Sequence, residues 1–179
     1  MVRILFVCHG NICRSPMAEF VMKKMVRDLP MSPSSGTSLY SDTSLSSGTS
    51  LTAADFEIAS AATSTEEIGN PVYPPARRML ARHNIDCSGK TARQMTYADY
   101  EHYDYIVLMD QNNLRNLRWI LPRDIYERET GTAPRKISLL MEWAGKNRDV
   151  ADPWYTGDFE ATWRDVNEGC KAMLTSICK

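Results

Sequence analysis

The sequence predicts a three-layer α/β/α fold with a central, mostly four-stranded parallel sheet. Short, continuously apolar runs at residues 4–7 and 105–109 are typical of strands that are buried on both faces. Along the chain these runs alternate with segments in which apolar residues recur at helical spacing. Strands that alternate with helices indicate a parallel sheet covered on both sides. The length of 179 residues suits one domain, which we expect to span residues 1–179.

The first predicted elements are a strand at residues 4–7 and a helix that begins near Ser15 and Pro16. Proline suits the first helical position, where its missing N–H is no loss, and Ser15 is a plausible cap. Pro30 is expected to end the helix. The residues that face the core follow helical spacing: Ala18, Val21, Met22 and Met25.

Residues 31–55 differ in kind from the rest of the chain. Within them, residues 34–51 form three hexads, SSGTSL, YSDTSL and SSGTSL. This low-complexity repeat is rich in Ser and Thr and has too few large apolar residues to form a core. We expect a surface loop that arose by duplication, and a regulatory or partner-binding role is the alternative.

The remaining elements follow from the same two periodicities. Strands are predicted at residues 56–61, 105–109 and 136–140, and helices at residues 74–84, 97–103 and 111–121. A long helix follows a loop at residues 151–153, and its apolar stripe consists of Phe159, Trp163, Val166, Cys170, Met173, Leu174 and Ile177. Ligands of such folds bind beyond the carboxyl ends of the strands, where Cys8 lies.

Composition excludes several classes of protein. The net charge of −1 argues against a nucleic acid or an anionic membrane as partner, because the overall field would attract neither. No apolar run approaches the length of a membrane span, and the first residues do not read as a signal peptide. Five cysteines, an odd number, do not fit a secreted disulfide framework. We expect a cytoplasmic protein that is a monomer or a weak homodimer.

The stretch at residues 8–16, CHGNICRSP, is predicted to bind an anion. A loop that leads into a helix N-terminus directs unpaired N–H groups and the positive end of the helix dipole at one point. Gly10 can take a positive φ and Asn11 tolerates one. Cys8, at the strand end, is then a thiol that ionises readily and acts as a nucleophile. Arg14 offers a planar fork that matches two phosphate oxygens.

Two alternatives compete with this interpretation. A buried strand-end thiol and an unrelated surface arginine would show the same spacing by chance, but the preceding strand, the loop composition and the Ser-Pro helix start favour an anion cradle. A zinc site formed by Cys8, Cys13, His83 and Cys87 is disfavoured, because the Cys-x₄-Cys spacing is unusual and ligation would consume the nucleophile. We therefore expect neither a metal nor another cofactor.

The sequence from Cys8 to Glu19, CHGNICRSPMAE, resembles the signature loop of the low-molecular-weight protein tyrosine phosphatases. The likeness continues, in matching order and spacing, through SAATS at residues 60–64, IGNP at 68–71, ARQ at 92–94, MD at 109–110, NLR at 113–115 and DP at 152–153. It covers nearly the whole chain apart from the Ser/Thr-rich insertion, where the family has a brief connection. The resemblance implies a single phosphatase domain that hydrolyses phosphotyrosine in proteins or peptides, and small aryl phosphates, through a phosphocysteine intermediate.

The resemblance also implies a role for Asp152. In the family, the aspartate of this Asp-Pro pair protonates the leaving oxygen and then activates the hydrolytic water. Pro153 biases Asp152 toward an extended conformation, which suits this role. From the residues alone, an ordinary loop aspartate is the alternative. Asp110, after a buried strand, is expected to support the loop. Residues implied to bind phosphate or to hold the loop are His9, Gly10, Asn11, Ile12, Cys13, Ser15 and Ser60. Besides capping the helix, the Ser15 hydroxyl is expected to donate to the Cys8 sulfur and to stabilise the thiolate.

Cys13 has two interpretations. It is either a structural thiol or, as the resemblance implies, the second cysteine that forms a reversible disulfide with the nucleophile. Such a disulfide protects the nucleophile from irreversible oxidation.

Three positions depart from the family pattern. His9 follows the nucleophile, where the family often has an aliphatic residue, and it either adds positive charge at the pocket mouth or is simply exposed. Glu66 stands where many members carry an aromatic pocket wall, so Trp154 and Tyr155 would supply the other, aromatic wall. Lys90 stands where some members have a histidine near the loop network. These departures leave substrate preference open.

Three other functions compete with tyrosine phosphatase activity. An arsenate reductase of the same fold would use the anion loop and a relay of cysteines, but it has no use for an acid such as Asp152. A protein-arginine phosphatase commonly has threonine at the position of Ile12, so isoleucine favours phosphotyrosine. A non-catalytic anion-binding module would have lost Cys8, Arg14 or Asp152, and all three are present.

Overall fold

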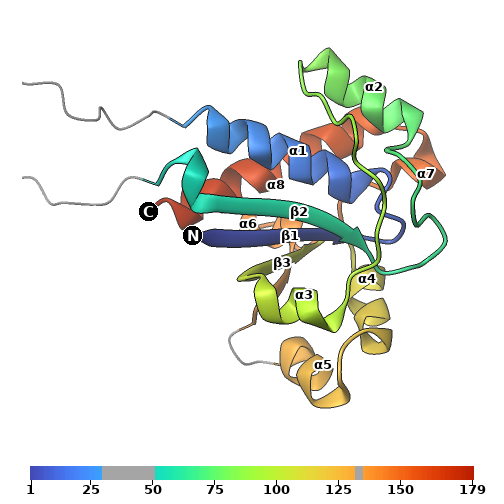
Figure 1. The fold of residues 1–179 in the computed structure, drawn as a ribbon, viewed down its shortest axis with the longest axis vertical. Helices are drawn as coiled ribbons and strands as arrows, with labels where there is room; N and C mark the ends of the chain where they lie inside the picture. The colour runs from blue at the N-terminus through green and yellow to red at the C-terminus, as the bar shows by residue number, and fades with distance from the viewer. Residues whose placement is uncertain (30–50, 132–134) are drawn as a thin grey trace, which may run out of the picture.

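The computed structural model describes residues 1–29, 51–131 and 135–179 (Figure 1). Residues 30–50 and 132–134 fall outside the described residues. Most of the predicted insertion, with all of its three hexads except Leu51, lies in the first of these gaps, so the interpretation of that segment stays a prediction.

The described strands form one parallel sheet, as predicted. They are β1 (Val2–Cys8), β2 (Phe56–Ala62), β3 (Tyr105–Leu108) and β4 (Ile137–Leu139). Their order is β2-β1-β3-β4, and every neighbouring pair is parallel. Strand β1 is therefore flanked on both sides, and the order reverses between β1 and β3. In open α/β sheets this switch point is where ligands bind.

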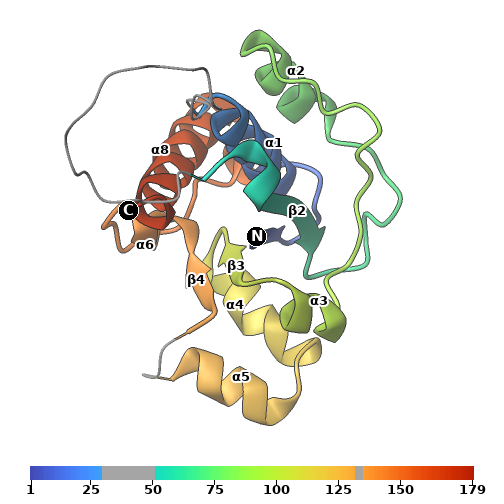
Figure 2. The same cartoon turned by 60° about the vertical axis from the view of Figure 1, so that its left-hand side comes forward.

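Helices cover both faces of the sheet (Figure 1, Figure 2). One face carries α1 (Arg14–Arg27), α6 (Leu140–Trp143) and α8 (Phe159–Ile177), and the other carries α3 (Tyr97–His102), α4 (Gln111–Asn116) and α5 (Arg123–Thr130). The remaining helices are η1 (Ala53–Asp55), α2 (Pro74–Arg82), η2 (Leu117–Trp119) and α7 (Pro153–Thr156). The three-layer α/β/α prediction is confirmed.

The alternation of side chains along β1 explains why the sheet is buried on both faces. Ile4 and Phe6 pack into the core shared with α1, α6 and α8, whereas Leu5 and Val7 pack into the core on the side of α3 and α5. All four side chains are fully buried. A continuously apolar strand therefore fits this central position, where the side chains on both of its faces are buried.

Several boundaries differ from the prediction. The helix expected at residues 111–121 ends at Asn116, and its last turn tightens into the 3-10 helix η2 ahead of Pro122. The helix expected to reach residue 84 ends at Arg82, and Asn84 follows with a positive φ of 56°. The short helices α5, α6 and α7 were not predicted, because elements of four to eight residues show little periodicity.

The start of α1 corrects the expected role of Ser15. The helix begins at Arg14, so its N-cap is Cys13, which provides no side-chain cap. Ser15 and Pro16 are the second and third helical residues, and proline is tolerated there because first-turn N–H groups lack helical partners anyway. The Ser15 hydroxyl is thereby free to point toward Cys8. No described helix combines the length and apolar character that a membrane crossing requires.

Candidate active site

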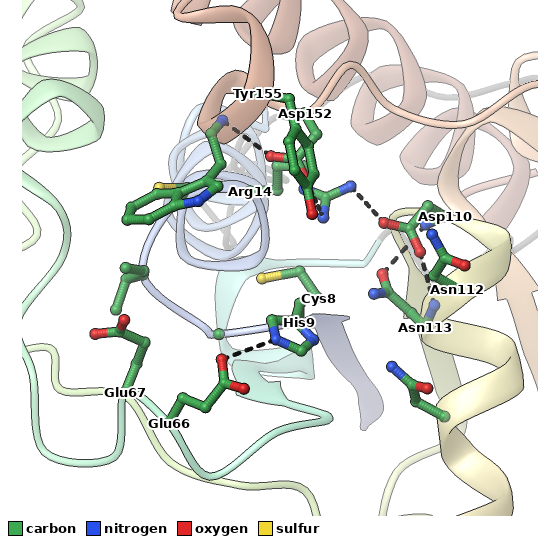
Figure 3. Close-up of a pocket in the computed structure, with 15 residues that line it drawn as sticks. Cys8, His9, Arg14, Glu66, Glu67, Asp110, Asn112, Asn113, Asp152 and Tyr155 are labelled. Carbon is green, nitrogen blue, oxygen red and sulfur yellow. Dashed lines mark hydrogen bonds and ion pairs between the residues drawn. The ribbon is translucent and has the colours of Figure 1, made fainter.

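The loop at residues 9–13 lies between the end of β1 and the start of α1 and curls around the Cys8 sulfur (Figure 3). Its carbonyl groups bond outward: Thr63 N donates to the oxygen of Cys8 (2.9 Å), Ser64 N to that of His9 (3.0 Å) and Tyr73 N to that of Ile12 (2.9 Å). In a trans peptide the N–H points opposite to the C=O. Anchoring the carbonyls outward therefore turns the following N–H groups inward.

The Cys8 sulfur is nearly buried and has two hydrogen-bond partners. Its residue is 3% exposed. Asn11 N donates to Cys8 Sγ at 3.3 Å, and the Ser15 hydroxyl lies 3.0 Å from the sulfur. The Ser15 proton can go to the sulfur or to the Ala61 carbonyl at 3.3 Å. Both partners stabilise a negatively charged sulfur.

Asn11, rather than Gly10, provides the left-handed turn of the loop. Asn11 has φ of 57°, whereas Gly10 is not among the residues with positive φ, which corrects the expected use of this glycine. Gly10 serves close approach instead, since a Cβ there would lie 3.1 Å from Glu67 Cγ. The buried Asn11 amide donates to the Ser15 hydroxyl (2.9 Å) and the Ser60 hydroxyl (2.8 Å). These bonds fix the loop's shape.

The network continues behind the loop to a buried ion pair. The Ser60 hydroxyl donates to Glu19 Oε2 at 2.6 Å, and Lys90 Nζ lies 3.2 Å from the same oxygen. Burial lowers the pKa of Lys90, although Glu19 opposes this shift. Sequence reasoning missed the role of Glu19. The available signal was its position one turn after Ser15, which places both residues on the same face of α1. Lys90, left uncertain from the sequence, belongs to this network.

Arg14 is buried between two carboxylates. Its Nη1 donates to Asp110 Oδ2 at 2.6 Å, and its Nη2 lies 2.7 Å from Asp152 Oδ2. Burial alone would lower the pKa of Arg14, but the negative groups Cys8, Asp110 and Asp152 outweigh burial and raise it. The guanidinium therefore stays charged beside the sulfur.

Each carboxylate is held by a helix start. Asp110 caps α4, because its Oδ1 accepts from Asn113 N at 2.6 Å. Asp152 caps α7, with its Oδ1 accepting from Trp154 N at 3.0 Å. Asp152 has the extended backbone predicted from Pro153 (φ −92°, ψ 108°). These caps aim both carboxylates at Arg14.

These groups line a cavity of about 440 Å³. Figure 3 shows the thiol, the guanidinium and Asp152 around one space. Predicted residues that line it are Cys8, His9, Gly10, Ile12, Cys13, Arg14, Glu66, Asp110, Asp152, Trp154 and Tyr155, and Glu67, Asn112, Asn113 and Asn116 were not predicted. Asn11, within the loop, does not line the cavity; its amide bonds Ser15 and Ser60, which lie behind the loop and hold it.

The rim combines charged and aromatic side chains. His9 Nε2 lies 3.0 Å from Glu66 Oε2, so the two departures from the family pattern pair with each other. Opposite them, Trp154 is 60% and Tyr155 85% exposed. Tyr73 packs against Trp154 with ring centroids 5.6 Å apart. The rim therefore has one polar side and one aromatic side.

Cys13 lines the same cavity but differs from Cys8 in environment. Burial, together with the nearby Cys8 and Asp152, raises its pKa to about 12. Its thiol is therefore protonated at neutral pH. Among the described residues no three His, Cys, Asp or Glu side chains come together as metal ligands, and His83 stacks on Trp163 instead. The zinc alternative has no support in this geometry.

Comparisons with known proteins point to one family. A family model described as low molecular weight phosphotyrosine protein phosphatase matches residues 3–42 and 44–179. The human protein of that name is 35% identical over 174 residues, which cover 96% of this chain and 92% of the human one. The crystal structure of YfkJ from Bacillus subtilis covers 99% of this chain and 94% of its own, with 30% identity and a TM-score of 0.77. That of a Drosophila arginine phosphatase covers 98% of both chains, with 25% identity and a TM-score of 0.72.

Proposed function

The chain belongs to the low molecular weight phosphotyrosine protein phosphatase family, and from this premise we propose that Cys8, Arg14 and Asp152 together hydrolyse phosphotyrosine in the cavity that they line. The protein is a protein tyrosine phosphatase, a hydrolase whose substrates are phosphoproteins. One observation carries the residue assignment: a sulfur held by N–H and O–H donors, a buried guanidinium and an anchored carboxyl converge on one cavity.

In the first step, the Cys8 thiolate attacks phosphorus. A P–S bond forms and the P–O bond to the phenol breaks. Arg14 and the inward N–H groups of the loop hold the phosphoryl oxygens and stabilise the charge of the transition state. Asp152 gives its proton to the departing phenolic oxygen. The products of this step are phosphocysteine and the dephosphorylated tyrosine.

In the second step, water hydrolyses phosphocysteine. Asp152, now a carboxylate, takes a proton from the water as it attacks phosphorus. The P–S bond breaks, and the electron pair returns to the sulfur. The Ser15 hydroxyl, 3.0 Å from the sulfur, stabilises the thiolate as a leaving group. Inorganic phosphate then leaves the cavity.

Cys13 does not compete with Cys8 for this chemistry. Its pKa of about 12 keeps it protonated at neutral pH, and only a thiolate attacks efficiently. Its place in the cavity lining supports the reversible disulfide with Cys8 that the family resemblance implies. A cytoplasmic location, where thiols stay reduced, suits both cysteines.

Two related activities are separated by particular residues. Ile12, where arginine phosphatases commonly have threonine, lines the cavity and favours phosphotyrosine over phosphoarginine. Asp152, held in the cavity, favours a phosphatase over an arsenate reductase, which needs no acid for a leaving group. Parallel assays on phosphotyrosine, phosphoarginine and arsenate should show turnover of phosphotyrosine above the other two.

Substitution of the nucleophile tests the assignment. Cys8→Ser should abolish hydrolysis of p-nitrophenyl phosphate, because a serine hydroxyl is not ionised at neutral pH. Phosphate binding, measured by calorimetry, should persist, because the loop N–H groups and Arg14 form the cradle. Cys178→Ser, at an exposed cysteine outside the cavity lining, is the matched control and should retain turnover. Substantial hydrolysis by Cys8→Ser would refute the assignment.

A further inference from the structure

The residue before Asp152 has both of its backbone groups bonded to side chains of α8. Ala151 N donates to Asp165 Oδ2 at 3.0 Å, and the Thr162 hydroxyl donates to the Ala151 oxygen at 2.8 Å. Thr162 and Asp165 lie one turn apart on α8, so they share a face of the helix. Two buried side chains of one helix thus hold one peptide segment from both sides.

Both side chains are themselves anchored. Asp165, 7% exposed, is gripped by the Arg148 guanidinium through bonds of 2.8 and 2.6 Å. Burial would raise the pKa of Asp165, but these bonds and the one from Ala151 N outweigh burial and lower it. Thr162 is fully buried. An ionised, bidentate carboxylate and a buried hydroxyl are rigid supports.

The other side of this segment is tied to the sheet. Val150 N donates to the Met109 oxygen at 2.9 Å, directly after β3. Beyond Asp152, the hydrogen bonds of the described residues are local, because Thr156 N and its hydroxyl donate to the Asp152 oxygen at 3.4 and 3.2 Å, and Trp154 packs against Tyr73. The backbone that precedes the acid is therefore fixed on two sides by hydrogen bonds to other elements.

The acid needs such support because its carboxyl has two tasks. Asp152 Oδ2 pairs with Arg14 Nη2 at 2.7 Å. During catalysis the Arg14 fork faces the phosphoryl oxygens, so the carboxyl must turn to the leaving oxygen. With Ala151 held, this motion is a rotation of the Asp152 side chain about a fixed backbone.

We propose that Thr162 and Asp165 are positioning residues for Asp152: by binding both backbone groups of Ala151, they place the acid within reach of the leaving oxygen. This inference rests on the proposed role of Asp152 as general acid. It concerns only the proton transfer, because neither residue lines the cavity or contacts Cys8 or Arg14 in the described structure.

The experiment uses Thr162→Val, which removes the hydroxyl and keeps the shape. Single-turnover rates should fall about tenfold or more for phosphotyrosine, toward the roughly 10²-fold that a misplacement of about 1 Å can cost. The rate for p-nitrophenyl phosphate, whose leaving group needs less help from an acid, should fall far less. Affinity for phosphate should stay within twofold of wild type. Thr175→Val, at an exposed threonine of α8 that bonds the Lys171 oxygen, is the matched control and should change neither rate.

A double mutant separates positioning from general destabilisation. In the Asp152→Asn background, Thr162→Val should cause no further loss on phosphotyrosine, because there is no acid left to position. Asp165→Asn is a second variant, which keeps an acceptor for Ala151 N but loses the charge paired with Arg148. Like Thr162→Val, it should slow the hydrolysis of phosphotyrosine more than that of p-nitrophenyl phosphate. Equal slowing on both substrates, or full additivity with Asp152→Asn, would overturn the inference. If Asp152→Asn alone showed no preference for the poorer leaving group, the proposed function of Asp152 would fail first.

Discussion

At the scale of single residues, Arg14 is balanced by two carboxylates. A guanidinium that is only 4% exposed loses its hydration, and unpaired it would destabilise the fold by several kcal/mol. Asp110 and Asp152 offset this loss through their ion pairs with Arg14. The two partners differ in freedom, because Asp110 is 11% exposed and Asp152 26%. The more exposed partner, Asp152, is the one whose carboxyl can leave its ion pair with Arg14 and turn to the leaving oxygen of the substrate.

Asp152→Asn should slow the hydrolysis of phosphotyrosine far more than that of p-nitrophenyl phosphate. Tyrosine leaves as a more basic phenolate, which requires a proton during bond cleavage, whereas p-nitrophenolate leaves with less help. Loss of a general acid typically costs about 10²–10⁴ in rate, and the poorer leaving group should show the larger loss. The measurement is single-turnover kinetics on both substrates.

Asp149→Asn provides a control on the same segment. Asp149 accepts from Gln111 N at 3.1 Å and lies outside the cavity lining, so its variant should leave the ratio of the two rates unchanged. Equal slowing on both substrates by Asp152→Asn would mean that the acid is another residue.

At the scale of elements, α8 packs closely on α6. Gly169 of α8 faces Leu140 at the start of α6, and a Cβ on Gly169 would lie 2.5 Å from Leu140 Cγ and 3.1 Å from its carbonyl oxygen. Only glycine allows this approach. The position of α8 matters to the site, since the same helix carries Thr162 and Asp165.

Gly169→Ala should lower the free energy of unfolding by roughly 1 kcal/mol or more. Overpacking costs about 1–3 kcal/mol, and the 2.5 Å approach to Leu140 Cγ places Gly169→Ala toward the upper end of that range. Alanine recovers up to about 1 kcal/mol of helix propensity. Urea denaturation followed by circular dichroism measures the difference. Lys171→Ala, at an exposed position of the same helix, should stay within about 0.5 kcal/mol of wild type. A Gly169→Ala variant as stable as wild type would contradict this prediction, because it would show that α6 can shift away from α8 with no loss in the free energy of unfolding.

At the scale of the whole molecule, the sheet order places the site. Because β1 lies between β2 and β3, the loop that follows β1 meets segments that follow both neighbours. Ser64, after β2, donates to the His9 oxygen of this loop, and Asp110, after β3, accepts from Arg14 at its end. The site therefore depends on the assembled sheet.

Deletion of residues 34–51 should leave this assembly intact. The three hexads contain few large apolar residues, and loop-closure free energy changes by only about 0.6 kcal/mol for each doubling of loop length. We expect a thermal midpoint within a few degrees of wild type and unchanged kcat on p-nitrophenyl phosphate. A variant with a Gly/Ser linker of equal length separates the effect of length from that of sequence. Failure of the deleted protein to fold, or loss of most of its turnover, would contradict the interpretation of these residues as a surface loop.

Much of the fold and the centre of the site could be predicted because they are local. The buried strand β1, the loop and α1 are contiguous, so the strand end, the loop composition and the helix start together predicted that Cys8 and Arg14 meet at one point. Apolar periodicity predicted the strands of the sheet and the apolar stripe of α8, because periodicity within one element is also a local property of the sequence. The family resemblance, rather than periodicity, pointed to Asp152, which lies far along the chain from Arg14.

Only the tertiary structure decided the partners of these groups. It paired His9 with Glu66, made Cys13 rather than Ser15 the N-cap of α1, brought Glu19 and Lys90 behind the loop, and connected Asp152 to α8 through Ala151. It also revealed the short helices α5, α6 and α7. Periodicity reports which face of an element is buried, but a hydrogen bond or ion pair between elements depends on how their faces pack together, and that packing is set by the whole core at once.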